Sequence, residues 1–356
     1  MLVPDPWCGE AKLVPFENIE WIKDLPDNTY CALWQRWPSQ SQVIIPSGYD
    51  LYVFSFHLEA VDVDWVNQQS LRLQSPIILL SDSNYYDYPF NKNVWAYTYY
   101  YWHEQTRLIS SWYPNRIAKS NKFKASAFCN RITQSKLWIF TALAEHVKND
   151  CLLKLDDWLE EKNVHYREKT NIKELDKLSD VFWSKYWGKT FSIDSFNNEK
   201  HNYQQYTCNP YSRAYIDALF NFTNESFHYS YHCNETCEFV YPGPFLTEKT
   251  LKCLAGGTPF VAVGQYDTYN PLSILGFDFD YGPLDLSWDN DPGNLSRMLS
   301  VIELIKQLSS YSINDLVDFT KSSAEHNYNH VIEKGFYNMC QLHNNKIIEQ
   351  IFSDIN

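Results

Sequence analysis

The sequence predicts an α/β fold in which parallel strands alternate with helices in two domains. Three parts of the chain carry this prediction: residues 49–80, 122–147 and 247–263 each combine a short apolar run with an adjoining helical pattern. Strands buried on both faces, as in parallel sheets, are near-continuous apolar runs, and helices between them favour an α/β architecture. With 356 residues, the chain is long enough for two domains that each have a core.

The first of these parts is predicted as strand, helix, strand. Tyr49 to Phe56 and Pro76 to Leu80 are the strands, and Val61 to Leu73 is the helix. His57 and Asp82 follow the two strands, so we expect both at the carboxyl ends, where open α/β sheets bind ligands. They are the candidates for a catalytic base. The structural alternative is that a residue such as Asp82 only caps the next helix.

The same pattern starts again near residue 122. Phe123 to Cys129 is predicted as a strand and Lys136 to Val147 as an amphipathic helix. The loop between them contains Asn130 and Arg131. If this is the first strand–loop–helix unit of a second domain, both residues face its ligand-binding crevice.

Three further segments complete the prediction of elements. Asp150 to Asp180 is highly charged with intermittent Leu and Trp, which favours an exposed helical insertion. Tyr211 to Phe220 is predicted to be helical, and residues 299–355 are predicted to form two or three amphipathic helices.

A helix and a strand between Thr247 and Val263 form the most informative segment. Thr247 is a suitable N-cap, and Gly256 and Gly257 end the helix because glycine readily adopts the left-handed conformation. Pro259 to Val263 is predicted as a buried parallel strand, which ends at Gly264. The inward positions of the helix are Leu251, Leu254 and Ala255.

Glu248 and Lys249 lie in the first turn of this helix. A helix N-terminus carries free N–H groups and partial positive charge, which suit a phosphate. Lysine adds charge, and a glutamate can accept two hydrogen bonds from a ribose diol, so the pair suits a nucleotide-sugar site. Glu and Lys are also common in first helical turns for structural reasons, since glutamate there favours the helix dipole.

The motif resembles a known donor-binding pattern. Pro244-Phe-Leu-Thr-Glu-Lys-Thr250 followed by Ala255-Gly-Gly-Thr-Pro-Phe-Val-Ala-Val-Gly264 is similar to the motif of GT-B glycosyltransferases, particularly the α1,3-fucosyltransferase-like pattern. It looks still more like phage and giant-virus glycosyltransferases with Phe-x-Thr-Glu-Lys-Thr and Gly-x-Pro-Phe. The similarity runs from near Tyr203 to Gly282, and the N-terminal half matches no family that we can name.

This resemblance implies the GT-B fold, in which two Rossmann-like domains face each other across a cleft. We expect an acceptor-binding domain over residues 1–120 and a nucleotide-sugar-binding domain over residues 121–310, with residues 150–180 as its charged insertion. In GT-B enzymes the last helix crosses back to the N-terminal domain, and residues 311–356 are long enough to do so.

The expected reaction is sugar transfer from a nucleoside diphosphate sugar to an acceptor hydroxyl. Such chemistry needs a base and positive charge for the departing diphosphate, and GT-B enzymes usually supply that charge without a metal or other cofactor. Glu248 is expected to bind the ribose. The expected diphosphate ligands are Lys249, Arg131 and the N–H groups near Thr247, and Asn130 and Gly264 complete the candidate donor site.

Two other functions fit parts of this pattern. A catalytically inactive binding module on the same fold would differ from the enzyme by turning over no nucleotide sugar. A nucleotide-sugar epimerase would need a Gly-x-Gly-x-x-Gly turn, which the chain lacks.

The net charge of −13 argues against nucleic-acid binding by the whole surface, but the charge is uneven. Between Glu104 and Glu145 the chain has seven basic residues and no acidic one. Such a local excess of positive charge favours an anion site over a solvated linker. These basic residues are Arg107, Arg116, Lys119, Lys122, Lys124, Arg131 and Lys136.

The predicted acceptor is double-stranded phage or viral DNA carrying a hydroxymethylated base, specifically 5-hydroxymethylcytosine. Arg116 and the basic stretch would contact phosphates, and Tyr85 and Tyr86 would stack on a flipped base, as would the aromatic cluster at residues 99–102. The negative net charge opposes this, and the tyrosines also suit ordinary packing. A glycan or lipid-linked acceptor, as for fucosyltransferases, and a protein acceptor stay open.

No apolar run reaches the length needed to span a bilayer, and the N-terminus has no signal-like core. We therefore expect no membrane insertion and a soluble protein of the cytoplasm, the host cytoplasm if the chain is viral.

Metal-binding patterns are weak. His228, His232, Cys233 and Cys237 have spacings that zinc could use but lack a double Cys-x2-Cys signature, so pocket or core roles are preferred. The pairs Asp62-Val-Asp64 and Asp278-Phe-Asp280 are interpreted as structural.

Overall fold

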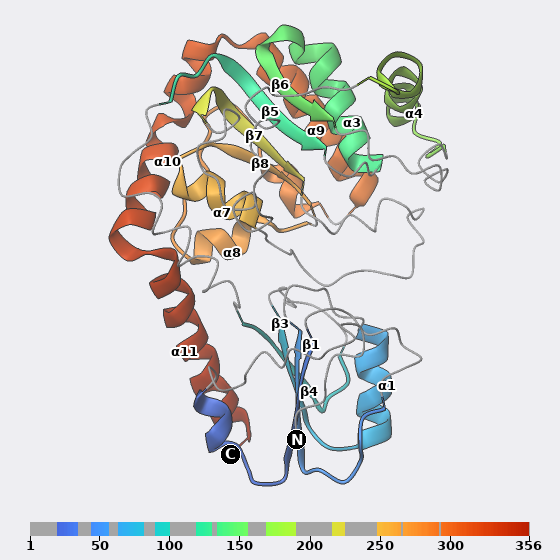
Figure 1. Ribbon diagram of the computed structural model, residues 1–356, viewed down its shortest axis with the longest axis vertical. Helices are drawn as coiled ribbons and strands as arrows, with labels where there is room; N and C mark the ends of the chain where they lie inside the picture. Colours follow the sequence, from blue (N-terminus) through green and yellow to red (C-terminus); the bar gives the residue numbers. More distant parts are fainter. Residues whose placement is uncertain are drawn as a thin grey trace. The chain divides into compact units, whose positions relative to one another are not determined.

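The structure is a computed structural model (Figure 1). It describes residues 20–34, 44–56, 63–81, 90–99, 119–129, 134–155, 169–189, 216–224, 248–264, 266–291 and 293–355. The chain divides into two compact units. The first unit comprises Met1–Glu104, Phe239–Phe245 and Tyr337–Asn356, and the second comprises Gln105–Glu238 and Leu246–Phe336. The second unit thus continues past the predicted boundary at residue 310.

The first unit contains a four-stranded parallel sheet in the order β1-β2-β3-β4. Its strands are β1 (Thr29–Trp34), β2 (Leu51–Phe56), β3 (Ile77–Ser81) and β4 (Val94–Thr98). Helix α1 (Val63–Leu73) connects β2 to β3. The predicted strand–helix–strand pattern is therefore confirmed. Strands β1 and β4 were not predicted from the sequence.

The two faces of this sheet are covered by different parts of the chain. Right-handed crossovers in a sheet of sequential order place all connecting helices on one face. That face packs against α1, with Phe54 beside Trp65. The opposite face packs against a 3-10 turn, η2 (Glu20–Asp24), and the C-terminal helix α11 (Phe336–Ile355), whose Ile351 joins Val53 and Leu80 (Figure 1). The C-terminal helix thus completes the core of the N-terminal sheet.

The second unit contains another four-stranded parallel sheet, in the order β6-β5-β7-β8. Its strands are β5 (Phe123–Cys129), β6 (Cys151–Leu155), β7 (Ala218–Asn224) and β8 (Phe260–Val263). The main helices are α3 (Gln134–Ala142), α4 (Lys173–Val181), α7 (Glu248–Ala255), α8 (Tyr269–Ile274), α9 (Asn294–Ser310) and α10 (Ile313–Lys334). An α/β architecture with two parallel sheets is thereby established.

The structure differs from the sequence prediction in two segments of this unit. Residues 151–155, expected in an exposed insertion, form the edge strand β6, and α4 buries Leu175 and Leu178. Trp138 on α3 donates a hydrogen bond to Ser179 on α4, at 2.9 Å. The charged residues on the outer side of α4 led the sequence analysis to predict an exposed segment instead of this packing. Residues 218–220, expected in a helix, belong to β7.

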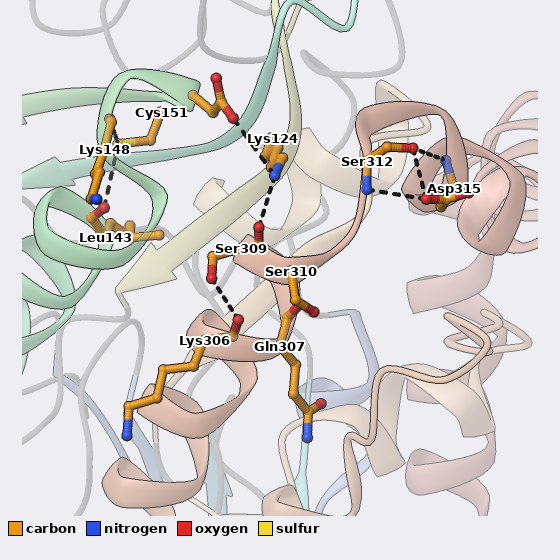
Figure 2. Close-up of polar contacts among 11 residues, drawn as sticks. Lys124, Leu143, Lys148, Cys151, Lys306, Gln307, Ser309, Ser310, Ser312 and Asp315 are labelled. Atoms are coloured by element: carbon orange, nitrogen blue, oxygen red, sulfur yellow. Dashed lines mark hydrogen bonds and ion pairs between the residues drawn. The ribbon is translucent and has the colours of Figure 1, made fainter.

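The junction between α9 and α10 is fixed by polar contacts (Figure 2). Lys124 Nζ on β5 donates to the carbonyl of Ser309, at 3.0 Å, and lies 3.6 Å from Asp150 Oδ2. A cation suits this position because the C-terminal end of a helix carries partial negative charge. Two residues after α9 ends, Ser312 and Asp315 form a capping box that begins α10.

Replacing Gly257 with alanine is expected to destabilise the protein more than the same change at Gly188. Both glycines are left-handed, with φ of 58° and 72°. A Cβ at Gly257 would lie 3.0 Å from the carbonyl oxygen of Ala324, whereas at Gly188 it would meet nothing within 4 Å. Gly188→Ala therefore carries backbone strain of about 1–2 kcal/mol, and Gly257→Ala adds a clash of about 1 kcal/mol or more. Urea unfolding measures both; equal losses would contradict the close packing against α10.

Candidate functional site

The candidate site is the carboxyl edge of the second sheet. The chain leaves β5 toward β6 on one side and later returns to β7 on the other side, so the strand order reverses between β5 and β7. In open α/β sheets, ligands bind outside the carboxyl ends of the strands at such a switch point. Here these ends are Cys129 and Asn224.

Helix α7 brings the sequence motif to this edge. In the chain it lies between β7 and the parallel strand β8, and it leads into β8 through residues 256–259. The helix begins at Glu248, and Lys249 is half-buried in its first turn. The predicted inward residues Leu251, Leu254 and Ala255 are all buried. Because the helix in such a crossover runs antiparallel to the strands, its first turn, which contains Lys249 and free N–H groups, points toward the carboxyl edge of the sheet.

The helix end predicted from Gly256 and Gly257 is confirmed. Gly257 is left-handed, and its N–H donates to the Leu254 carbonyl at 3.1 Å. The Thr258 N–H donates to the Cys253 carbonyl at 2.8 Å. These bonds satisfy the last carbonyls of α7 and direct the chain into β8.

A buried arginine fixes the end of β8. Gly264 follows the strand, and its carbonyl oxygen accepts a hydrogen bond from Arg297 Nη2 at 3.0 Å. The same guanidinium donates to the Asp291 carbonyl at 2.6 Å and to Asn294 Oδ1 at 2.8 Å. Arg297, 1% exposed, thus ties the first turn of α9 to the candidate Gly264. No motif in the sequence marks this arginine.

Asp289 is a second buried ionisable group in this region. Its Oδ2 accepts a hydrogen bond from the Tyr269 N–H at 2.8 Å, so the carboxyl group caps α8. Burial raises the pKa of Asp289 to about 7, while the N–H groups of Tyr269 and Thr268 and the charge of Arg297 oppose this rise. Its role is to hold α8 beyond the end of β8, and sequence reasoning did not find it.

Most of the predicted site residues lie outside the described part of the chain. Lys249 and Gly264 are described, and the backbone of Glu248 belongs to α7. The residues outside it are His57, Asp82, Tyr85, Tyr86, Arg116, Asn130, Arg131 and Thr247. Strands β2 and β3 end at Phe56 and Ser81, which are register partners, and His57 and Asp82 are the next residues in the sequence.

Within the described residues, the lysines of the basic stretch lie at the start of β5 and on α3. Lys119, Lys122 and Lys124 precede or begin β5, at the amino edge of the sheet. Lys124 is the second of the seven residues of β5, so the five residues after it separate it from the carboxyl end by about 17 Å. Lys122 lies 3.9 Å from Asp217 Oδ1, and Lys124 binds the end of α9 (Figure 2). These three lysines, from the stretch expected to form a local anion site, therefore lie at the edge opposite the candidate donor site, because the strand places them there.

The structural interpretation of Asp278-Phe-Asp280 agrees with its contacts. Asp278 accepts hydrogen bonds from the Asp280 N–H and from Ser323 Oγ, and Asp280 accepts one from the Gly282 N–H. Within the described ranges, no group of three or more His, Cys, Asp or Glu could hold a metal ion. The segment from His228 to Cys237 lies outside those ranges, as does Asp62.

Tyr99, from the aromatic cluster predicted to stack on a base, is a core residue of the first unit. Its ring is buried against the C-terminal helix and η2. This position corrects the stacking role for Tyr99, because its ring already packs inside the protein.

Comparison of the chain with protein families, curated proteins and solved structures finds no match. No helix in the described part of the chain is both long and apolar enough to cross a membrane.

Proposed function

We propose that this protein is a GT-B-type glycosyltransferase that uses a nucleoside diphosphate sugar. The observation that carries the proposal is the position of Glu248 and Lys249 in the first turn of α7, the helix between the parallel neighbours β7 and β8. Two α/β units in one chain and the motif resemblance support it further.

In this proposal the donor lies at the carboxyl edge of the second sheet. The diphosphate accepts hydrogen bonds from the N–H groups at the start of α7, and Lys249 supplies positive charge as the leaving group departs. Glu248 accepts hydrogen bonds from the ribose hydroxyls. Arg297 donates a hydrogen bond to the carbonyl of Gly264 and keeps the end of β8 in place.

The proposed base is His57 or Asp82. The strands that precede them are neighbours in the first sheet, and both strands end at the same register position. A base there would remove the proton of the acceptor hydroxyl as the sugar is transferred. The acceptor class stays a prediction from the sequence, with hydroxymethylated DNA as the first class to assay.

Glu248→Gln and Lys249→Ala are expected to weaken donor binding at least tenfold and leave the fold intact. A glutamate in a first helical turn contributes only about 0.3–1 kcal/mol to its helix, whereas a charged hydrogen bond to a ligand contributes about 1.5–3 kcal/mol. The measurement is calorimetric titration with a panel of nucleotide sugars, after thermal-shift screening. Donor at a hundredfold its dissociation constant should stabilise the wild type by about 2.7 kcal/mol.

Glu303→Gln serves as the matched control, because Glu303 is an exposed helical glutamate that pairs with Lys306 on α9. It should bind the donor as the wild type does. If no nucleotide sugar binds the wild type, or if both motif variants retain wild-type affinity, the donor assignment fails. Binding without any transfer or hydrolysis would instead support the inactive binding module.

A further inference from the structure

The chain that follows β8 is held by two buried residues, Asp289 and Arg297. We call Gly264 and residues 266–269 the post-β8 segment, which leads from the carboxyl edge of the second sheet to α8. Arg297 Nη2 donates a hydrogen bond to the carbonyl of Gly264 at 3.0 Å. Because an arginine side chain keeps its positive charge at every ordinary pH, this contact is the constant part of the arrangement.

Asp289 holds the rest of the segment through two hydrogen bonds. Its backbone carbonyl accepts one from the Asp267 N–H at 2.6 Å, and its carboxyl group accepts one from the Tyr269 N–H at 2.8 Å. Asp267 is left-handed, with φ of 61°, and such a backbone costs about 1–3 kcal/mol. Strained backbone persists only where the surrounding contacts over-determine it. Loss of the contacts with Asp289 would therefore favour another backbone conformation in the segment.

The side chain of Tyr269 limits how far such a change can spread. Its hydroxyl group donates to the Phe260 carbonyl at 3.1 Å and accepts from the Ala262 N–H at 3.0 Å, so the ring is tied to β8. A cavity of about 570 Å³ is lined by α8, by residues 277–280 and by Asp289. The backbone before α8 thus has space beside it, while the start of the helix stays anchored to the sheet.

The carboxyl group of Asp289 is the titratable part of this arrangement. It belongs to a side chain that is 3% exposed, and burial raises its pKa to about 7. The charge of Arg297 on α9 opposes this rise, and the charge of Asp267 adds to it. Asp278 and Asp280 line the same cavity. If the segment opened to water, the pKa of Asp289 would return toward its ordinary value of 3.8, so the open form would bind fewer protons.

We propose that Asp289 and Arg297 form a pH-sensitive latch, which holds the post-β8 segment at low pH and releases it as the pH rises toward neutrality. Its opening moves backbone at the carboxyl edge of the sheet, where Gly264 lies, and so changes the shape of any ligand site formed there. The inference concerns the free protein and does not depend on the proposed transferase activity.

The test follows hydrogen exchange at the amides of Asp267 and Tyr269 in the full-length protein, corrected for the intrinsic exchange rate at each pH. Between pH 5 and pH 7 their protection should fall at least tenfold, because the open form releases the proton of Asp289. It should also stay below the protection of the β5 amides at every pH, since the latch opens without unfolding of the sheet.

Two results in the wild type would overturn the inference. The first is protection at Asp267 and Tyr269 that does not change between pH 5 and pH 7. The second is protection equal to that of the β5 amides throughout, because the segment would then open only when the whole unit unfolds.

Asp289→Asn assigns the pH effect to one side chain. The asparagine oxygen can still accept the Tyr269 N–H but does not titrate, so protection should change less than threefold over the same range. Asp285→Asn is the matched control and should follow the wild type, because Asp285 is exposed and accepts its hydrogen bond from the Ser287 N–H. A tenfold fall that persists in Asp289→Asn would assign the effect to another group and refute the latch.

Discussion

Ile351→Asp is expected to unfold the first unit while the second unit keeps its fold. Ile351 lies on α11, is 0% exposed and packs among apolar residues on one face of the N-terminal sheet. An aspartate there loses about 2–5 kcal/mol of packing and leaves a charge in an apolar cluster. Because domains are stabilised by only about 5–15 kcal/mol, hydrogen exchange at the amides of β2 and β3 should become fast.

Leu342→Asp is the matched control for this prediction. Leu342 lies on the same helix but is 64% exposed, so the change should alter the free energy of unfolding by less than about 0.5 kcal/mol. Deletion of residues 337–356 should reproduce the effect of Ile351→Asp. Slow exchange in β2 and β3 after either change would show that the sheet is stable without α11.

This dependence follows from the topology of the first unit. Its sequential strand order places right-handed connections on the face of α1, and in the described part of the unit η2 and α11 cover the apolar side chains of the other face. His343 on α11 adds a hydrogen bond with the Thr98 carbonyl at 3.0 Å, at the end of β4. Tyr97 on β4 also donates one to Asp354. The N-terminal unit is thus completed only when the end of the chain is in place.

Elements with strong local signals were predicted from the sequence. The strands β2 and β3 are continuous apolar runs that are buried on both faces, and α7 has a capping position, an apolar stripe and terminal glycines. Strand β7 was missed because Asn221 and Thr223 make it look polar. Both side chains are buried, and Asn221 Nδ2 donates to Ser126 Oγ on β5 at 2.9 Å. These buried polar groups obtain their hydrogen-bond partners only once the sheet has formed.

In the candidate site, too, features that depend on neighbouring residues were predicted, and features that depend on contacts between distant residues were not. The motif at Glu248 and Lys249 depends on neighbouring residues, so spacing reveals it. Arg297 binds the carbonyl of Gly264, a residue 33 positions away, and Asp289 caps a helix 20 positions earlier. Neither contact follows a repeat or a spacing rule, so only the folded chain identifies these two residues.

Between about pH 5 and pH 8, the wild-type protein is expected to lose stability relative to Asp289→Asn as the pH rises. Burial raises the pKa of Asp289 to about 7 in the folded protein, whereas its ordinary value is 3.8. In this window the folded protein retains a proton that the unfolded chain has released, so stability is greatest below the ordinary pKa and falls until the pH passes the folded pKa. A difference of one in a pKa corresponds to about 1.4 kcal/mol, so the expected relative loss over this window is about 1–3 kcal/mol.

Urea unfolding of both proteins across this range measures the difference. The asparagine oxygen can still accept the Tyr269 N–H, so the variant should fold and lack only the titrating group. Asp285→Asn is the matched control, because Asp285 caps a nearby turn through Ser287 but is exposed. This control should follow the wild-type pH profile. Parallel profiles for wild type and Asp289→Asn would mean that Arg297 and the capping N–H groups keep the Asp289 carboxylate ionised throughout, contrary to the raised pKa.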